Sequence, residues 1–169
     1  MSFDKAFAST MKSEGGYTVI DGHETFMGID RVRHPEWLGW PAIDYCKQNK
    51  IPFTHHTYIT DAVRNFYYDE FWLKPKLDKL NDAVACECFE AGVNCGPSNG
   101  IKFLQRALRV LGYNVGVDGK IGNETLRAVN DCLVKGHIDI LVRCQNGEQY
   151  CYYKDWSKHA DFPGVFRRT

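Results

Sequence analysis

A Gly-rich segment from Glu14 to Ile29 interrupts a chain that is otherwise patterned as amphipathic helices. Apolar side chains before it recur at the spacing of one helix face: Phe3, Phe7 and Met11. This spacing predicts a helix over residues 2–13, which carries Glu14 at its C-terminal end and is ended by Gly15-Gly16. Residues 17–30 mix glycines with short apolar alternation, and this mixture favours a small β-hairpin or an irregular ribbon.

The rest of the chain is expected to be helical. Apolar residues at helical spacing, bounded by prolines and turn formers, predict helices over residues 34–47, 60–74, 75–91, 98–111, 123–135 and 138–158. A break in the last helix at Asn146-Gly147 stays open as an alternative. The fold class that follows is mainly α, with one small β-hairpin.

Turn formers cluster at residues 92–97 and divide the chain into residues 1–97 and 98–169. No tether rich in Ser, Gly or Pro follows this cluster, so independent domains would lack a linker to move on. Each segment alone would also expose apolar helix faces. We therefore expect the two segments to pack as one compact unit.

Composition excludes several classes of partner. The 169 residues carry a formal net charge of zero, so no basic field attracts nucleic acid or an anionic membrane surface. No apolar stretch reaches the roughly 18 residues of a membrane span, and the start Met1–Lys5 lacks the apolar core of a secretory signal. We expect a cytoplasmic monomer without stable membrane association.

Seven cysteines are an odd number, so at least one thiol stays outside any intramolecular disulfide. Without a secretory signal, reduced cysteines that act as small core residues are the simplest interpretation. The spacing of Cys86, Cys88 and Cys95 matches no usual zinc pattern. No metal and no cofactor are expected.

Two acids in the Gly-rich segment indicate sugar chemistry. Glycosidic bond cleavage needs one carboxyl group to protonate the leaving oxygen and a second to orient water or stabilise positive charge on the sugar. Glu14 lies at the negative end of the helix dipole, which raises the pKa of a carboxyl group as a general acid requires. Asp21 is the candidate second acid, with the Thr25 hydroxyl beside it, although an Asp-Gly pair is also a common hairpin turn.

Motifs along nearly the whole chain resemble one known family, the glycoside hydrolase family 108 muramidases with an attached peptidoglycan-binding segment. The resemblance is carried by Glu14–Tyr17 continuing to Thr25 and Gly28-Ile29, by the aromatic stretch Tyr67–Trp72, by Phe89–Gly96, by residues 100–130 with their LQ, DG, G and TL landmarks, and by Gly164–Arg168. It implies a lysozyme-like fold whose hairpin lies at the active-site cleft.

The resemblance also implies roles for individual residues. Glu14 corresponds to the proton donor, Asp21 to the second acid and Thr25 to its helper, while Glu24 remains a competitor of Asp21 because this hairpin is shorter than is usual in the family. Tyr17 and Asn94 are the expected substrate-binding residues.

The function that follows is an N-acetylmuramidase acting on bacterial peptidoglycan glycan strands, with no nucleic acid partner. A phage endolysin, made in the host cytoplasm and released to the cell wall through membrane lesions, is the expected biological role, and a resident bacterial autolysin is the second option. A lytic transglycosylase and a non-catalytic peptidoglycan-binding or secretion-accessory protein are the alternatives.

Overall fold

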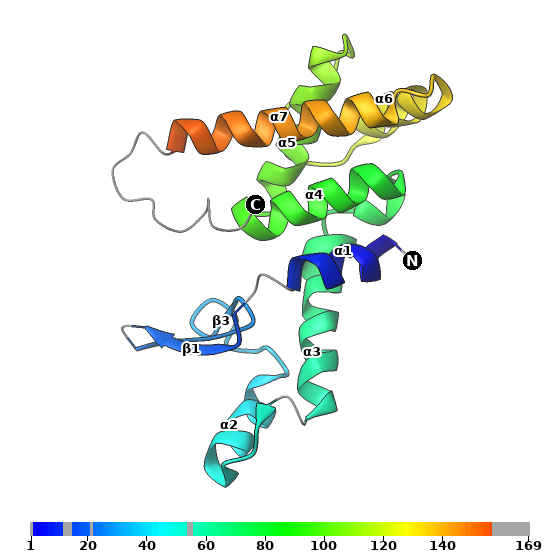
Figure 1. Ribbon diagram of the computed structural model, residues 1–169. Helices are drawn as coiled ribbons and strands as arrows, with labels where there is room; N and C mark the ends of the chain where they lie inside the picture. The colour runs from blue at the N-terminus through cyan, green and yellow to red at the C-terminus, as the bar shows by residue number, and fades with distance from the viewer. Residues whose placement is uncertain (1, 12–14, 21, 54–55, 157–169) are drawn as a thin grey trace. The chain divides into compact units, whose positions relative to one another are not determined.

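The computed structural model describes residues 2–11, 15–20, 22–53 and 56–156 (Figure 1). Helices dominate, and one three-stranded antiparallel sheet accompanies them. The prediction of a mainly α, lysozyme-like fold with a small hairpin is thus confirmed. The chain divides into two compact units. We call residues 7–70 the hairpin unit, and residues 1–6 together with 71–169 the helical unit.

The sheet of the hairpin unit contains β1 (Tyr17–Ile20), β2 (His23–Phe26) and β3 (Ile29–Asp30), in that order. Ile20 pairs with His23, so residues 21 and 22 connect β1 and β2, and Gly22 adopts a φ of 79° that favours glycine. The connection from β2 to β3 is anchored by Tyr67, whose hydroxyl donates a hydrogen bond of 2.8 Å to the Met27 carbonyl. The predicted hairpin is confirmed.

Three helices belong wholly or partly to the hairpin unit: α1 (Ser2–Met11), α2 (Trp40–Asn49) and α3 (Thr57–Tyr68), which continues into the π-helical turn η2 (Asp69–Leu73). The prediction that a helix starts at residue 34 is wrong. Asp30 accepts hydrogen bonds from the backbone of Val32 and Arg33, and the His34 carbonyl accepts one from the Trp40 indole, so residues 31–39 form turns. The next helix was predicted to start at residue 60, but α3 starts at Thr57, directly after His56.

The helical unit contains a short 3-10 turn, η3 (Leu77–Lys79), and α4 (Asp82–Cys95). A helix was expected from residue 75, but Lys76 adopts a left-handed φ of 65° that ends helical geometry. Asn81 then starts α4, and its side chain accepts a 3.0 Å hydrogen bond from the Ala83 backbone. A turn was expected over residues 92–97, but α4 continues to Cys95, so Gly96 is the one residue between α4 and the next helix.

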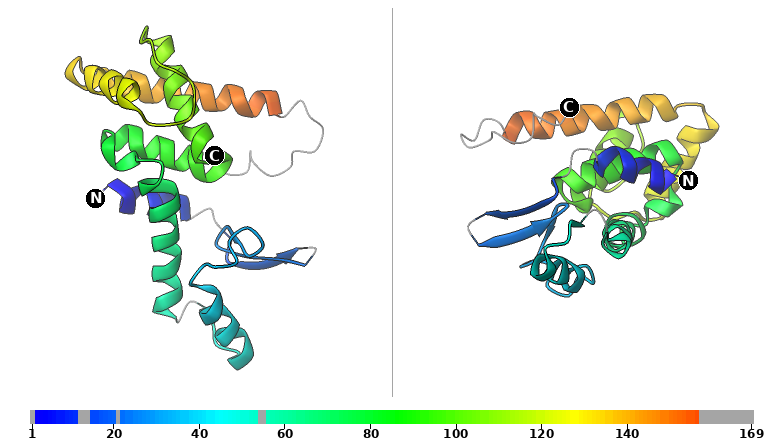
Figure 2. Two further views of the ribbon diagram at one scale, coloured as in Figure 1. Left: turned by 180° about the vertical axis from the view of Figure 1, so that it is seen from behind. Right: turned by 60° about the horizontal axis from the view of Figure 1, so that its bottom comes forward.

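The remaining helices are α5 (Pro97–Val110), α6 (Asn123–Val134) and α7 (Ile138–Trp156), and α7 runs unbroken through Asn146-Gly147. Helices α4, α5 and α7 pack on one another, and α6 adds to α5 and α7 (Figures 1 and 2). The contact of α4 with α5 is close because a Cβ atom at Gly100 would lie 2.5 Å from the Cys88 carbonyl oxygen. The core of the helical unit is therefore shared between the two predicted segments.

Two cysteines contribute to this core, whereas Cys151 on α7 is exposed. Cys88 and Cys132 are buried, and the buried Gln145 amide lies 3.2 Å from the Cys88 sulfur. Burial raises the pKa of the Cys88 thiol to about 12, which keeps it protonated and unreactive at neutral pH. No disulfide joins cysteines within the described residues.

A buried glutamine holds the Gly-rich loop between α5 and α6. The Gln105 amide nitrogen donates to Asp118 at 2.8 Å and to the Lys120 carbonyl at 3.0 Å, and its oxygen accepts from the Gly119 backbone at 2.9 Å. The Thr125 hydroxyl lies 3.4 Å from the same amide nitrogen. The LQ, DG and TL landmarks of the sequence thus meet at one side chain.

Gln105→Met is expected to lower the free energy of unfolding by about 1–3 kcal/mol, the usual cost of leaving buried polar groups unsatisfied. The apolar side chain fills similar space but leaves the Gly119 N–H without its acceptor. Urea denaturation measures the loss, and Gln48→Met on the exposed surface of α2 is the matched control. Equal stability of the two variants would contradict the role given to Gln105.

Among the described residues, no helix combines the length and the apolar character that a bilayer span requires.

Candidate active site

The predicted site residues fall in different parts of the chain. Tyr17, Glu24 and Thr25 belong to the hairpin unit, whereas Asn94 belongs to the helical unit. Glu14 and Asp21, the two predicted catalytic acids, lie outside the described residues. The described part of the predicted site is therefore the hairpin, which carries Tyr17, Glu24 and Thr25.

Strand register sorts the hairpin side chains onto two faces. Tyr17 pairs with Phe26, and Thr25 pairs with Thr18 on one side and with Asp30 on the other. Because side chains alternate along a strand, Tyr17 and Glu24 share one face and Thr25 lies on the opposite face. The half-buried Thr25 is thus separated from Glu24 by the sheet itself.

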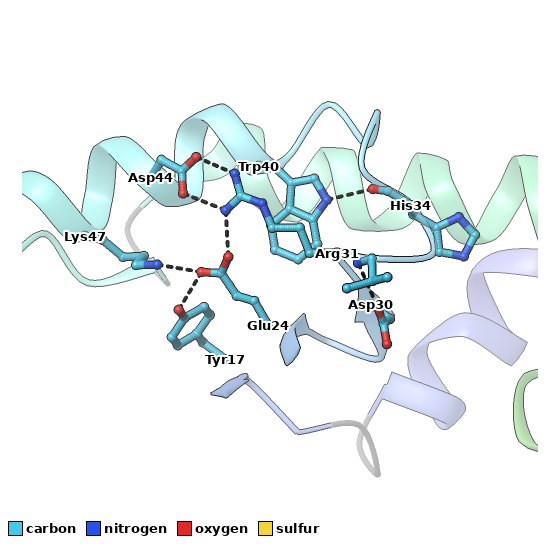
Figure 3. Close-up of polar contacts among 9 residues, drawn as sticks. Tyr17, Glu24, Asp30, Arg31, His34, Trp40, Asp44 and Lys47 are labelled. Atoms are coloured by element: carbon cyan, nitrogen blue, oxygen red, sulfur yellow. Dashed lines mark hydrogen bonds and ion pairs between the residues drawn. The ribbon is translucent and has the colours of Figure 1, made fainter. Parts of the chain in front are cut away.

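Glu24 lies at the centre of a polar network (Figure 3). One carboxylate oxygen accepts hydrogen bonds of 2.5 Å from the Tyr17 hydroxyl and from the Lys47 ammonium. The other oxygen accepts from the Arg31 guanidinium at 2.7 Å. Both oxygens of Glu24 are therefore occupied by donors from β1, from the end of the hairpin and from α2.

Arg31 extends the network to α2. Its two terminal nitrogens donate to the two oxygens of Asp44 at 2.8 and 2.7 Å, a bidentate arrangement that fixes orientation as well as charge. The guanidinium carbon also lies 5.0 Å from the centre of the Trp40 ring. These contacts attach β2 and the segment after β3 to α2 (Figure 3).

The electrostatics of Glu24 favour a permanently charged carboxylate. Burial alone would raise its pKa, but hydrogen bonds from Lys47, Tyr17 and Arg31 outweigh burial and lower the pKa to about 2. The partners respond in the opposite sense, since hydrogen bonding to Glu24 raises the pKa of Lys47. Because both oxygens already accept hydrogen bonds and Arg31 and Lys47 balance the charge, Glu24 has little capacity left to orient water or to stabilise positive charge on a sugar, and this favours Asp21 as the second acid.

Tyr17 has a fixed position in the network. The Lys47 ammonium lies 5.2 Å from the centre of its ring, and the Phe53 ring lies at a centroid distance of 5.3 Å. Its hydroxyl donates a hydrogen bond to the Glu24 carboxylate. The expected contact of Tyr17 with substrate remains a prediction, and what the structure adds is that the side chain is held in place before any ligand binds.

Asn94 lies in the last turn of α4 and is exposed. Its amide nitrogen donates a 3.0 Å hydrogen bond to the Glu90 carbonyl one turn earlier in the same helix. The predicted substrate contact of Asn94 also remains a prediction.

Sequence reasoning missed Arg31, Asp44 and Lys47. Arg31 and Asp44 are 13 residues apart and Glu24 and Lys47 are 23 apart, so no local pattern connects them. The helical spacing of Asp44 and Lys47 was the available signal, and it indicates a shared helix face without identifying what that face contacts. Within the described residues, no group of three or more His, Cys, Asp or Glu side chains is arranged to hold a metal ion.

Glu24→Gln is expected to destabilise the hairpin unit at neutral pH by about 1 kcal/mol, because the Arg31 and Lys47 side chains are 33% and 41% exposed and solvent screens their attraction to Glu24. Because the folded-state pKa is depressed, this stabilisation is present above the unfolded-state pKa and is lost as the pH falls through about 2. Urea denaturation at several pH values should show that wild type and variant differ most above about pH 5 and converge in acid. Asp61→Asn on the exposed face of α3 is the control. A difference that does not vary with pH would contradict the charged network.

Comparison with known proteins decides the family. The model of the glycosyl hydrolase 108 family matches residues 7–96, more than half of the chain. The chain belongs to the glycosyl hydrolase 108 family. The model of a predicted peptidoglycan domain matches residues 99–161 of this glycosyl hydrolase 108 protein. The two matches, in this order, identify a peptidoglycan-degrading enzyme of the glycoside hydrolase class.

A solved structure is similar to this glycosyl hydrolase 108 member. SagA of Brucella abortus has a TM-score of 0.60 and 23% sequence identity, over 90% of this chain and 80% of its own. At this identity the likeness shows the fold. No curated protein matches the chain.

Proposed function

We propose that this glycosyl hydrolase 108 member is an N-acetylmuramidase that cleaves the β-1,4 bond between N-acetylmuramic acid and N-acetylglucosamine. The observation that carries the proposal is the pair of family matches, a glycoside hydrolase segment over residues 7–96 followed by a peptidoglycan domain over residues 99–161. In this mechanism Glu14 protonates the glycosidic oxygen, and Asp21, helped by Thr25, positions water or stabilises the developing positive charge on the sugar.

The Glu24 network supports this assignment of roles. With Glu24 fully engaged by Tyr17, Arg31 and Lys47, Asp21 is the remaining acid between β1 and β2. The network also holds β2, which carries Thr25, against α2 before substrate arrives. Such preorganisation lowers the cost of reaching the reactive geometry.

Mass spectrometry of digested cell wall tests the bond specificity. Purified sacculi are incubated with the full chain, and the soluble products are reduced with borohydride before measurement. Reduced N-acetylmuramic acid ends are expected. Anhydro ends, which resist borohydride, would instead indicate a lytic transglycosylase. Reduced N-acetylglucosamine ends would indicate cleavage of the other glycosidic bond, and an absence of soluble products would indicate a non-catalytic peptidoglycan-binding protein.

We further propose that the enzyme is a monomeric endolysin, which acts on the cell wall after release from the host cytoplasm. The support is the likeness of its Glu14–Ile29 motif to those of phage muramidases. Expression in a bacterial host with and without a separately induced pore-forming protein tests the role. Lysis that depends on the pore is expected, and lysis without the pore would contradict it.

A further inference from the structure

A shallow cavity of about 350 Å³ opens on the helical unit, between the loop after α5 and the exposed side of α6. Val115 and Ala128 contribute its apolar floor, and both are almost fully buried. Two kinds of polar side chain surround this floor. Some form hydrogen bonds or ion pairs within the protein, and others, among the described residues, form neither.

One wall of the cavity is fixed. The Tyr113 hydroxyl donates a 2.6 Å hydrogen bond to Asp131, and the Lys135 ammonium forms a 2.6 Å ion pair with the same carboxylate. The Lys135 ammonium also lies 5.5 Å from the centre of the Tyr113 ring. The charge of Asp131 is thus balanced internally, and the Tyr113 ring is held in one orientation.

Two opposite charges on the same cavity are not balanced in this way. Glu124 and Arg127 both line it from α6 and both are exposed. In the part of the chain that the structure describes, no side-chain hydrogen bond or ion pair engages either residue. Their three-residue separation places them on adjacent positions of the helix surface, yet they do not pair with each other. The cavity therefore presents one free cation and one free anion, among the described residues, above an apolar floor.

We propose that this cavity binds a free α-amino-acid end, in which an ammonium and a carboxylate share one carbon atom. The Arg127 guanidinium takes the carboxylate through paired hydrogen bonds, and the Glu124 carboxylate accepts hydrogen bonds from the ammonium. The aliphatic stem of the ligand lies over Val115 and Ala128 beside Tyr113. Uncrosslinked stem peptides that contain diaminopimelate carry such an end, so the inference rests on the proposed function for the source of its ligand.

A glycan strand fits the same cavity less well. Sugar recognition by an aromatic residue uses an open ring face, whereas Lys135 lies over the Tyr113 ring. Neutral hydroxyl groups also leave the opposite charges of Glu124 and Arg127 without ionic partners. The zwitterionic ligand satisfies both charges at once.

Binding measurements with the full chain test the inference. Isothermal titration calorimetry compares three probes: a disaccharide tripeptide that ends in meso-diaminopimelate, the same molecule with lysine at that position, and the peptide-free disaccharide. The lysine form lacks the carboxylate beside the ammonium. We expect the diaminopimelate form to bind about tenfold more tightly than the lysine form, the size expected for one charge-assisted hydrogen-bonded pair. Arg127→Gln should remove this difference, while Arg109→Gln, on the exposed side of α5, should preserve it.

Other outcomes overturn the inference. Equal binding of the peptide-free disaccharide and the diaminopimelate form would assign the cavity to glycan. Equal binding of free meso-diaminopimelate and the disaccharide tripeptide would assign it to a small metabolite. Unchanged discrimination in both Arg127→Gln and Glu124→Gln would place the site elsewhere. Sacculus clearing by the unaltered chain, measured in parallel, reports on the proposed hydrolase activity separately, so failure of one proposal is distinguishable from failure of the other.

Discussion

Glu14→Gln is expected to lower the rate of cell-wall clearing by about 10²-fold or more, because the amide keeps the shape of the side chain but cannot donate a proton to the leaving oxygen. The assignment comes from the position of Glu14 at the predicted helix end and from the family to which the chain belongs. A turbidity assay on purified sacculi measures the rate. Thermal unfolding should leave wild type and variant within about 1 kcal/mol of each other, because the amide has nearly the same size and shape as the carboxyl group.

The control for this result is Glu36→Gln, which removes an exposed carboxylate from the same unit. Its clearing rate should match that of wild type. Retention of more than about a tenth of the activity by Glu14→Gln would exceed what the loss of a general acid permits, and the proton-donor role would then pass to another residue.

A fragment that ends at Pro97 is expected to be insoluble or molten, and inactive. Helix α4 belongs to this fragment, but it packs on α5 and α7, which the fragment lacks. Its apolar side includes Val84, Cys88 and Phe89, all almost fully buried in the intact chain. Without α5 and α7 this surface faces water, at a cost of about 25 cal/mol for each Å² of apolar area. Solubility on expression, near-UV circular dichroism and the turbidity assay measure the outcome.

Co-expression with residues 98–169 provides the control, since a separate second segment should restore solubility if the lost contacts are the cause. The intact chain should show one calorimetric transition that includes both segments. A soluble, lytic fragment ending near Pro97, or two separated transitions, would show instead that the segments fold independently.

Elements defined by their own periodicity were predictable from the sequence. Helix α5 combines a regular apolar face with Pro97 in its first turn and Gly112 after its end. The predicted and observed ends of this helix differ by no more than two residues. The hairpin was predictable for the same reason, since its glycines and alternating residues are local signals. The start of α2 was not predictable, because hydrogen bonds from the backbone to the Asp30 carboxylate and from the Trp40 indole to the His34 carbonyl determine the turns before it.

Residue type and order predict the chemistry of the candidate site, but the side-chain contacts around Glu24 were not predictable. Residue type and order single out Glu14, Asp21 and Thr25 as the acids and the hydroxyl for sugar chemistry. Residue type and order do not show that Arg31 and Lys47, which are distant from Glu24 in the sequence, balance the charge of the Glu24 carboxylate. Such contacts depend on tertiary packing, and no periodic pattern in a single sequence indicates them.

The packing of α4 constrains how such enzymes can recombine. The two family matches meet at residues 96–99, so an exchange of peptidoglycan segments between relatives would most simply be cut there. That cut would join the face of α4 around Cys88 to a foreign α5, although Gly100 leaves no room for any other side chain against the Cys88 backbone. A working chimera would have to keep α4 with its own α5, and a cut near residue 70 would do so only if residues 1–6, which belong to the same compact unit, came from the same parent. The segment that can be exchanged between relatives is then longer than the segment that the peptidoglycan domain model matches.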